Sequence, residues 1–249
     1  MKKVLVTGVS KNIGKAICER LVSDGYFVIG TYNTGKQEAE EIQVKLKNVE
    51  LYQVDLSDRT QVLELVEKIK SHQFYAIVNN AGVIHFELFH DLKLENWDHT
   101  FAVNLDAPLI IAHSLRNNME IGGSIINIAS TDGMNGCYAS IAYSASKAAL
   151  INLGKSLGNV FGPKNIRVNT ISPGWVGSGM DSPAIKEAEG NTPLGRTAKP
   201  EEIAKLVSYL ISDESSFING ENIVIDGGYS NVDTILKKEA TELEREQND

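Results

Sequence analysis

Short apolar runs alternate along this chain with longer segments of helical period, and this alternation restricts the fold more than any other feature. Seven of the runs are rich in β-branched and aromatic residues, which is typical of buried strands. Strands that alternate with helices indicate βαβ units. We therefore predict an α/β fold, with seven mainly parallel strands in a doubly wound sheet and helices on both of its faces. The predicted strands cover residues 3–7, 26–32, 50–54, 75–79, 124–129, 166–172 and 221–225, and the predicted helices cover 13–24, 35–47, 58–70, 96–117, 142–161 and 200–212.

The length of the chain and two segments without a clear period predict the domain organisation. A chain of 249 residues, of which 42% are hydrophobic, is long enough to bury one large core, so we expect one domain over residues 1–229. Within it, residues from about 175 to 199 follow a predicted strand and are rich in Gly, Pro, Ser and Asn, which predicts a ligand-covering loop. Residues 230–249 are charged with a thin apolar stripe, and we interpret them as a frayed helix or a disordered tail.

The composition argues against several kinds of partner. A net charge of -8 does not provide the basic surface that nucleic acid requires. The first apolar run is too short for a signal peptide and no later run is long enough to span a membrane, so we expect a soluble, cytoplasmic protein. Cys18 and Cys137 lie far apart, which predicts free thiols. The histidines are scattered over different predicted elements without zinc-site spacing, so no metal site is predicted.

The stretch TGVSKNIG, residues 7–14, joins the first predicted strand to the first predicted helix. Gly8 and Gly14 would let the backbone turn sharply and approach a pyrophosphate, to which the helix presents its N-terminal amides. Asn12 occupies a place where glycine is commoner, but asparagine tolerates a positive φ. An ordinary strand-to-helix turn would use similar glycines. The candidate dinucleotide-binding residues of this turn are Gly8, Ser10, Lys11, Asn12, Ile13 and Gly14.

The end of the second predicted strand bears on the choice between NAD and NADP. A carboxylate there would accept hydrogen bonds from the adenosine ribose and repel a 2′-phosphate. The chain has Tyr32, Asn33 and Thr34 at this place, and Lys11 would add a positive charge next to the same ribose. These features favour NADP(H) over NAD(H), with Asn33 as a further cofactor contact. The alternative for Lys11 is a solvated surface lysine.

Two further segments follow predicted strands and should lie at the same edge of the sheet. Asp55 comes directly after the third strand, where it would meet an adenine amino group, and a role at the start of a helix beside Ser57 and Asp58 explains it equally well. The stretch NNAG, residues 79–82, ends the fourth strand and suits a wall against a ligand, although a tight turn uses similar residues. The candidate cofactor contacts here are Asp55, Leu56, Asn80, Ala81 and Gly82.

The stretch YSASK carries the strongest chemical signal. It places Tyr143 and Lys147 four residues apart, on one face of a predicted helix. A tyrosine that acts as an acid or base near neutral pH needs its phenolate stabilised, and a neighbouring ammonium group does this. Ser130 ends the preceding strand, where its hydroxyl could share a substrate oxygen with the phenol. Without Ser130, such a Tyr/Lys pair would be interpreted as two surface residues without a catalytic role.

With TGxxxNxG, Asp55, NNAG, Asn104 in VNL, Ser130, YxxxK and SPGWVGS present in this order, the chain resembles the short-chain dehydrogenase/reductase family from about residue 2 to residue 229. The resemblance implies a Rossmann-type fold and one dinucleotide-binding and catalytic domain. It also implies an oxidoreductase that transfers hydride between NADP(H) and a substrate carbonyl or secondary alcohol.

The resemblance further implies roles for individual residues. Tyr143 would be the catalytic acid/base, and Lys147 would lower its pKa and hold the nicotinamide ribose. Ser130 would position the carbonyl, while Asn104 would support a proton-relay water. The nicotinamide-binding PGxxxT segment of the family is matched by Pro173, Gly174, Val176 and Ser178, with Ser178 in place of the usual threonine.

The chain departs from the family pattern in two places. Asn12 replaces the middle glycine of the turn, which bears on the phosphate site, and the segment 179–194 is short compared with many relatives, which leaves the substrate open. Alternatives within the family are a 3-oxoacyl-acyl-carrier-protein reductase and an NAD-dependent sugar or alcohol dehydrogenase. A dinucleotide sensor without turnover is the alternative from another class. The resemblance also predicts a small-molecule carbonyl or alcohol substrate and a homotetramer or homodimer.

Overall fold

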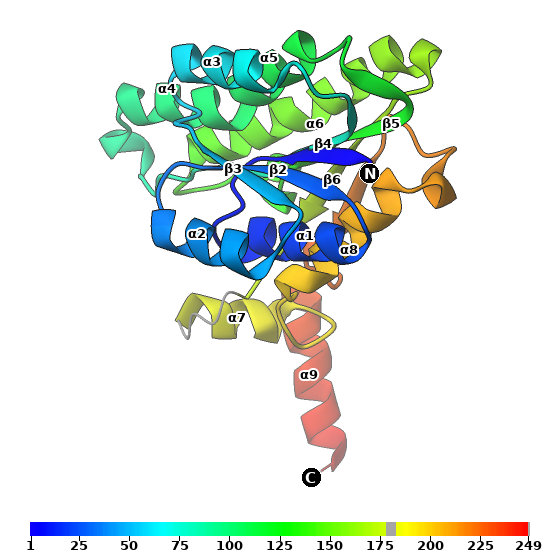
Figure 1. Ribbon diagram of the computed structural model, residues 1–249. Helices are drawn as coiled ribbons and strands as arrows, with labels where there is room; N and C mark the ends of the chain where they lie inside the picture. Colours follow the sequence, from blue (N-terminus) through cyan, green and yellow to red (C-terminus); the bar gives the residue numbers. More distant parts are fainter. Residues whose placement is uncertain (178–182, 249) are drawn as a thin grey trace.

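The computed structural model describes residues 1–177 and 183–248. In these residues the strands are β1 (Lys3–Val6), β2 (Phe27–Tyr32), β3 (Val49–Gln53), β4 (Phe74–Asn79), β5 (Met119–Ile128), β6 (Arg167–Pro173) and β7 (Asn222–Ile225). They form one sheet in the order β3-β2-β1-β4-β5-β6-β7, and each neighbouring pair is parallel (Figure 1). The strand order reverses between β1 and β4, as in a doubly wound sheet. The predicted sheet is therefore confirmed.

Helices cover both faces of the sheet, as the alternating pattern predicts (Figure 1). One face carries α1 (Asn12–Ser23), α2 (Lys36–Lys45) and α8 (Pro200–Ile211). The opposite face carries α3 (Arg59–Ile69), α4 (Leu94–Phe101), α5 (Ala107–Ser114) and α6 (Ile141–Phe161). Short 3-10 turns cover Phe89–Asp91, Thr131–Gly133, Gly162–Lys164, Asp213–Ser215 and Tyr229–Asn231.

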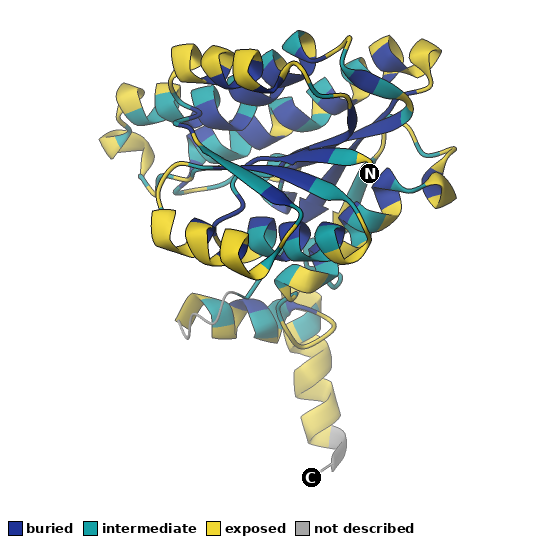
Figure 2. Cartoon of the chain, in the orientation of Figure 1, coloured by how far each residue is buried: buried dark blue, intermediate teal, exposed yellow. Residues whose placement is uncertain are grey.

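The core consists of two apolar clusters, one on each face of the sheet. Along β1, Val4 and Val6 belong to the cluster under α1 and α8, whereas Leu5 belongs to the cluster under α3 and α5. Successive side chains of a strand point to opposite faces, so a strand that is apolar throughout must be covered twice. Figure 2 shows this buried layer running through the sheet. The clusters hold the carboxyl ends of the strands in fixed positions.

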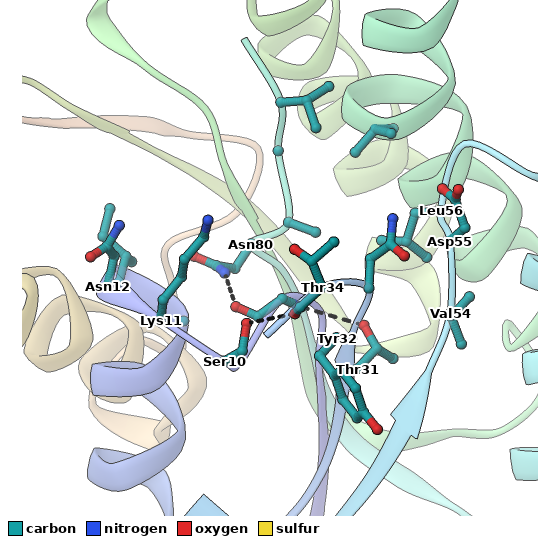
Figure 3. A pocket seen from close by; sticks show the side chains of 18 of the residues that line it. Ser10, Lys11, Asn12, Thr31, Tyr32, Thr34, Val54, Asp55, Leu56 and Asn80 are labelled. Carbon is teal, nitrogen blue, oxygen red and sulfur yellow. Dashed lines mark hydrogen bonds between the residues drawn. The ribbon is translucent and has the colours of Figure 1, made fainter. Parts of the chain in front are cut away.

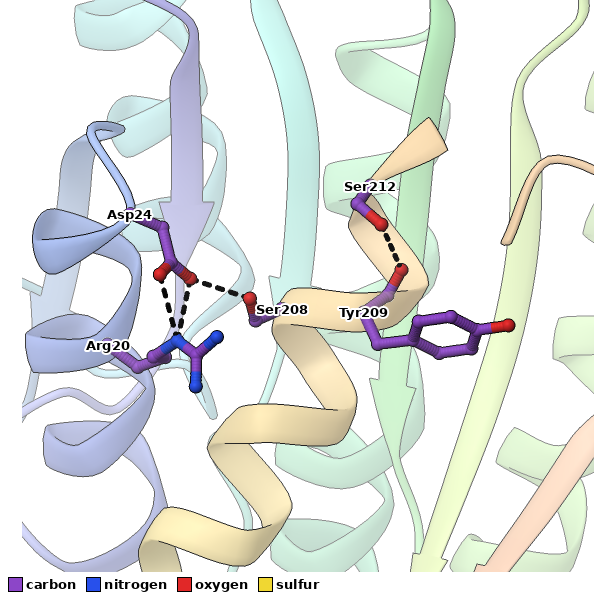
Figure 4. A network of polar contacts seen from close by, with 5 residues as sticks. All are labelled: Arg20, Asp24, Ser208, Tyr209 and Ser212. Atoms are coloured by element: carbon purple, nitrogen blue, oxygen red, sulfur yellow. Dashed lines mark hydrogen bonds and ion pairs between the residues drawn. The ribbon is translucent and has the colours of Figure 1, made fainter. Parts of the chain in front are cut away.

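A small polar network joins α1 to α8 on the outer surface (Figure 4). The Nε of Arg20 donates to both carboxylate oxygens of Asp24, at 2.9 and 2.8 Å. The hydroxyl of Ser208 donates to the same carboxylate at 2.6 Å, and that of Ser212 donates to the carbonyl of Tyr209 at 2.8 Å. The network therefore tethers α8 to the end of the helix that follows the glycine turn.

The predicted helix 96–117 is interrupted in the structure. It divides into α4, a π-helical turn over Ala102–Asp106, and α5. A π turn inserts an extra residue into the helix and occurs frequently at functional sites. Asn104 lies in this turn and is fully buried. The apolar period continues through the turn, which is why the sequence pattern predicts one helix.

The segment predicted as a loop over 175–199 contains a helix, α7 (Pro183–Asn191). Ala188 is the buried residue of α7. With one buried position, the helix has no repeating apolar face that a sequence pattern could detect. The charged tail forms α9 (Thr234–Asn248), which extends away from the sheet and its helices (Figures 1 and 2). Among the described residues, no helix combines the length and apolar character that crossing a bilayer requires.

Candidate active site

A cleft of about 430 Å³ opens at the carboxyl ends of β1, β2, β3 and β4, beside the reversal of strand order. In Figure 3, side chains from the turn after β1, the end of β2 and the segments after β3 and β4 surround this cleft. Open α/β sheets bind ligands at this kind of crevice. The predicted residues that line the cleft are Gly8, Ser10, Lys11, Asn12, Ile13, Gly14, Asn33, Asp55, Leu56, Asn80, Ala81 and Gly82.

The turn after β1 requires residues that accept unusual backbone angles or have no side chain. Gly8 has a φ of 74° and Asn12 a φ of 48°, so asparagine adopts the positive φ that the sequence pattern required of it. A Cβ on Gly14 would lie 1.9 Å from the carbonyl oxygen of Gly8 and 2.5 Å from the Nδ2 of Asn80. Only glycine fits at position 14, because a side chain there would collide with the turn itself and with Asn80.

The NNAG segment is hydrogen-bonded to this turn. The hydroxyl oxygen of Thr7 accepts from the backbone N–H groups of Asn80 and Ala81, both at 3.0 Å. The Nδ2 of Asn80 donates to the carbonyls of Thr7 and Gly8, at 2.9 and 3.1 Å. The amide of Asn80 therefore fixes the wall of the cleft, so its role in binding is to position the backbone.

The outer end of the cleft carries one cation, Lys11, and the carboxylate of Glu38 lies near this end without lining the cleft. Residues 32–34 contribute no acidic group, and the exposed Lys11 lines the same cleft. The hydroxyl of Ser10 donates to the carbonyl of Thr34 at 3.4 Å (Figure 3). A Cβ on Gly35 would lie 3.1 Å from a carboxylate oxygen of Glu38 and 3.2 Å from the hydroxyl of Ser10. Glu38 was not predicted here, because it belongs to the first turn of α2 and not to the end of β2.

Asp55 lines the cleft and also organises the start of α3. Its Oδ1 accepts hydrogen bonds from the backbone N–H and the hydroxyl of Ser57, at 2.9 and 2.7 Å. Asp58, and not Asp55, caps α3 by accepting from the N–H of Thr60 at 2.8 Å. Both of the roles considered for Asp55 are thus compatible with its position.

A second cavity of about 260 Å³ lies beyond the turn, toward β5 and α6. Ile13, Asn80, Gly82 and Val83 line both cavities, so the two spaces share one wall. Ser178 lies outside the described residues. The predicted residues that line the second cavity are Ser130, Tyr143, Lys147, Pro173, Gly174 and Val176.

The surroundings of Tyr143 disfavour its phenolate form. Burial raises its pKa to about 12, and the nearby Asp132 and Cys137 act in the same direction. The hydrogen bond with the Ser130 side chain acts in the opposite direction on the pKa but is outweighed. The hydroxyl of Ser130 also accepts from the backbone N–H of Asp132 at 3.1 Å, which orients it. A neutral phenol beside an oriented hydroxyl can donate a proton to a bound oxygen.

Lys147 is almost completely buried, with 3% of its surface exposed. Its ammonium group donates to the carbonyl of Ile128 at 2.8 Å and lies 5.5 Å from the centre of the Tyr143 ring. Burial lowers the pKa of Lys147 to about 8. The expected lowering of the tyrosine pKa is not seen in this structure, because the desolvation of Tyr143 is the largest contribution and raises it. The positive charge of Lys147 nevertheless lies over the Tyr143 ring.

The side chain of Asn104 is held by three hydrogen bonds, and its implied support of a relay water stays a prediction. Its Oδ1 accepts from the N–H of Val83 at 2.9 Å, and its Nδ2 donates to the carbonyl of Val83 and the hydroxyl of Ser146, both at 3.0 Å. Its side chain lines neither of the two cavities. The amide therefore holds the segment after NNAG against α6.

Several lining residues were not among the predicted contacts, since they are mostly apolar and look like ordinary core residues in the sequence. Their common signal is position, because most of them end a strand or directly follow one. His99 is an exception, because it reaches the cleft from α4 and contacts the ring of His85 with 3.0 Å between nitrogens. These residues are Thr31, Val54, Val83, Ile84, His99, Val103, Ile128 and Ala129.

A dinucleotide fits the residues of the two cavities. The tight turn at Gly8 and Gly14 places the start of α1 at the cleft, and a helix N-terminus is suited to bind a pyrophosphate. Gly82 lies between the cavities, and a Cβ there would come within 3.3 Å of the Lys147 ammonium nitrogen.

The family of enoyl-(acyl carrier protein) reductases matches residues 8–230 of this chain. The chain belongs to the short-chain dehydrogenase/reductase family.

Individual short-chain dehydrogenases/reductases resemble the chain over almost its whole length. The 3-oxoacyl-[acyl-carrier-protein] reductase of Thermotoga maritima is 34% identical, over 91% of this chain and 97% of the relative. The NAD-dependent glycerol dehydrogenase of Listeria innocua is 32% identical, over 92% and 94%. A short-chain dehydrogenase from Burkholderia cenocepacia, solved in complex with NADP, superimposes with a TM-score of 0.88 at 30% identity, over 92% and 98%. The chain is therefore an oxidoreductase of this family.

Proposed function

We propose that the protein is an NADPH-dependent carbonyl reductase in which Tyr143 is the proton donor. The observation that carries this proposal is that Ser130, Tyr143 and Lys147 line one cavity, which shares a wall with the cleft at the glycine turn. Residues 1–229 form the catalytic unit in this proposal, and the segment 175–199 covers the substrate. The relative that reduces 3-oxoacyl groups and the one named for glycerol show that the family framework accepts different substrates.

The residues of the second cavity divide the chemistry among them. A nicotinamide cofactor bound along the cleft supplies hydride to the substrate carbonyl carbon. The hydroxyl of Ser130 donates a hydrogen bond to the carbonyl oxygen and holds it next to Tyr143. Tyr143 gives its proton to that oxygen as negative charge develops there. Lys147 stabilises the resulting phenolate by its positive charge and holds the nicotinamide ribose.

The reaction class is tested by following NADPH oxidation with a panel of carbonyl compounds. The panel contains an acetoacetyl thioester, a cyclic ketone and a small hydroxyketone, each assayed with NADPH and with NADH. We expect turnover with NADPH and at least one carbonyl, and the thioester is the first compound to test. NADPH binding without turnover across the panel would favour a dinucleotide sensor, and turnover with NADH alone would favour an NAD-dependent dehydrogenase.

The preference for NADPH is proposed to depend on Lys11. Because Lys11 lines the outer cleft next to residues without a carboxylate, its ammonium group can contact a 2′-phosphate. Lys11→Ala should lower the NADPH-over-NADH ratio of kcat/KM by about tenfold. Lys68→Ala, which removes the same charge from α3 on the opposite face, should leave the ratio unchanged. An unchanged ratio in Lys11→Ala would assign the choice to Tyr32, Asn33 and Thr34 instead.

A further inference from the structure

His85 and His99 form a pair of imidazole rings at the edge of the cleft. The Nε2 of His85 and the Nδ1 of His99 lie 3.0 Å apart, and the ring centres are 5.3 Å apart with an interplanar angle of 60°. His99 belongs to the last turn of α4 and lines the cleft at the glycine turn. His85 follows Ile84, which lines the second cavity. The pair therefore lies beside the space proposed for the cofactor, although the proposed mechanism uses neither ring.

The segment that carries His85 is held on both sides of the ring. Before the ring, the N–H and the carbonyl of Val83 are hydrogen-bonded to the side chain of Asn104, at 2.9 and 3.0 Å. After the ring, the carboxylate of Glu87 accepts from the Nδ2 of Asn96 at 2.6 Å, and Asn96 lies on the same helix as the second ring. A contact that is positioned before a ligand arrives loses little conformational entropy on binding.

The number of protons on the pair decides its charge and its hydrogen bonds. Two neutral imidazoles carry one N–H each, and the contact between the rings uses one of them, so only one of the two remaining nitrogens carries a proton. A third proton keeps the shared hydrogen bond and gives an N–H to both remaining nitrogens, the Nδ1 of His85 and the Nε2 of His99. A fourth proton would place two N–H groups face to face. The pair can therefore hold one extra proton and one positive charge.

The charges around the pair act in both directions. Carboxylates favour an extra proton on the rings, whereas cations disfavour it. The dinucleotide carries phosphates, so its binding adds negative charge to the cleft and shifts this balance toward the protonated pair. The titratable groups on the surrounding elements are Lys11 after β1, Tyr32 on β2, Asp55 after β3, Glu87 and His90 after β4, Arg59 on α3, Glu95 and Asp98 on α4, Asp106 in the π-helical turn, Asp132 before α6, and Tyr143 and Lys147 on α6.

We propose that His85 and His99 together form a further cofactor-binding element, which takes up a proton from solvent when the dinucleotide binds. This inference rests on the proposed function, because it requires a phosphate-bearing cofactor in the cleft. The added proton stays on the ring nitrogens, and its positive charge stabilises the bound phosphates. The coupling is reciprocal, so a lower pH strengthens cofactor binding as much as the cofactor strengthens binding of the proton.

Isothermal titration with NADPH measures the proton uptake directly. The heat of binding is recorded near pH 7, where histidine changes its charge, in buffers of different ionisation enthalpy. The dependence of the heat on the buffer gives the number of protons exchanged. The pair is expected to contribute an uptake of about half a proton per site. By linkage, this contribution raises the Kd for NADPH about threefold for each unit by which the pH rises.

His99→Asn and His85→Gln each replace one ring by a neutral amide. The amide of asparagine lies near the place of an imidazole Nδ1 and that of glutamine near the place of Nε2, so the remaining ring keeps a polar partner. Both variants should lose the uptake that the pair contributes, together with its pH dependence. His113→Asn, on α5 and outside both cavities, is the matched control and should keep them. Circular dichroism reports that the variants are folded.

Other titrating groups are removed by comparing variants. Burial lowers the pKa of Lys147 to about 8, so this group and the 2′-phosphate of NADPH also exchange protons on binding. Both contributions are present in every variant and cancel in the difference between the original protein and His99→Asn. Titration with NADH, which has no 2′-phosphate, should show the same difference.

Equal proton uptake in the original protein and in His99→Asn would overturn the inference. Uptake that persists in His85→Gln would assign the proton to His99 alone and would overturn the pair. Both results would leave the catalytic proposal intact, because Tyr143 and Ser130 are unchanged in these variants. NADPH binding with the expected uptake but without turnover would support the pair and contradict the catalytic proposal. No binding of NADPH or NADH to the original protein would overturn both.

Discussion

Tyr143→Phe is expected to lower the NADPH-dependent reduction rate by about 10²–10⁴-fold, the contribution typical of a positioned acid or base. The substitution removes only the hydroxyl and keeps the ring in its partly buried place on α6. Ser130 keeps its hydrogen bond from the N–H of Asp132, so the substrate oxygen can still be oriented. The loss should therefore appear in kcat, with NADPH binding unchanged. Steady-state rates and fluorescence titration with NADPH measure the two quantities.

Tyr138→Phe is the matched control for this variant. Tyr138 lies in the loop before α6 and is 95% exposed, so the loss of its hydroxyl should leave kcat unchanged. Undiminished turnover in Tyr143→Phe would remove the tyrosine from the proposed mechanism. Equal losses in both variants would point to a disturbance of the loop and would likewise count against a specific proton donor.

Gly14→Ala is expected to weaken NADPH binding by about tenfold or more, a change of at least about 1.4 kcal/mol in binding free energy. The new methyl group would lie 1.9 Å from the carbonyl oxygen of Gly8, a backbone atom that cannot move without changing the turn. The same methyl would press on the Nδ2 of Asn80, which holds the NNAG wall. Isothermal titration with NADPH measures the affinity, and thermal unfolding measures the accompanying loss of stability.

Gly190→Ala serves as the control, because a Cβ at that position has no heavy atom within 4 Å and Gly190 lies in a helix. Alanine favours helix over glycine, so this variant should be at least as stable as the original protein. NADPH affinity that is unchanged in Gly14→Ala would show that the turn is not the phosphate site. A loss of the same size in Gly190→Ala would show that the assay does not resolve the site.

The strands and the chemistry-bearing motifs were predictable from the sequence because both depend on local periods. All seven predicted strands occur. A strand that is covered on both faces must be apolar at successive residues, so it appears in the sequence as an apolar run of strand length. The four-residue spacing of Tyr143 and Lys147 places them on one face of any helix, whatever it packs against. The positive φ of Asn12 was predictable for the same reason, because it depends on the residue and its turn alone.

Other features depend on which segments meet in space. The sequence by itself determined the parallel sheet, the glycine turn and the Ser130, Tyr143 and Lys147 set, because periods and spacings carry that information. Only the tertiary structure decided that Asn104 is hydrogen-bonded to Val83, that Glu38 lies near Ser10, and that burial raises the pKa of Tyr143. These properties arise from burial and from contacts between distant segments. Desolvation and packing are set by the whole fold, so no local pattern contains them.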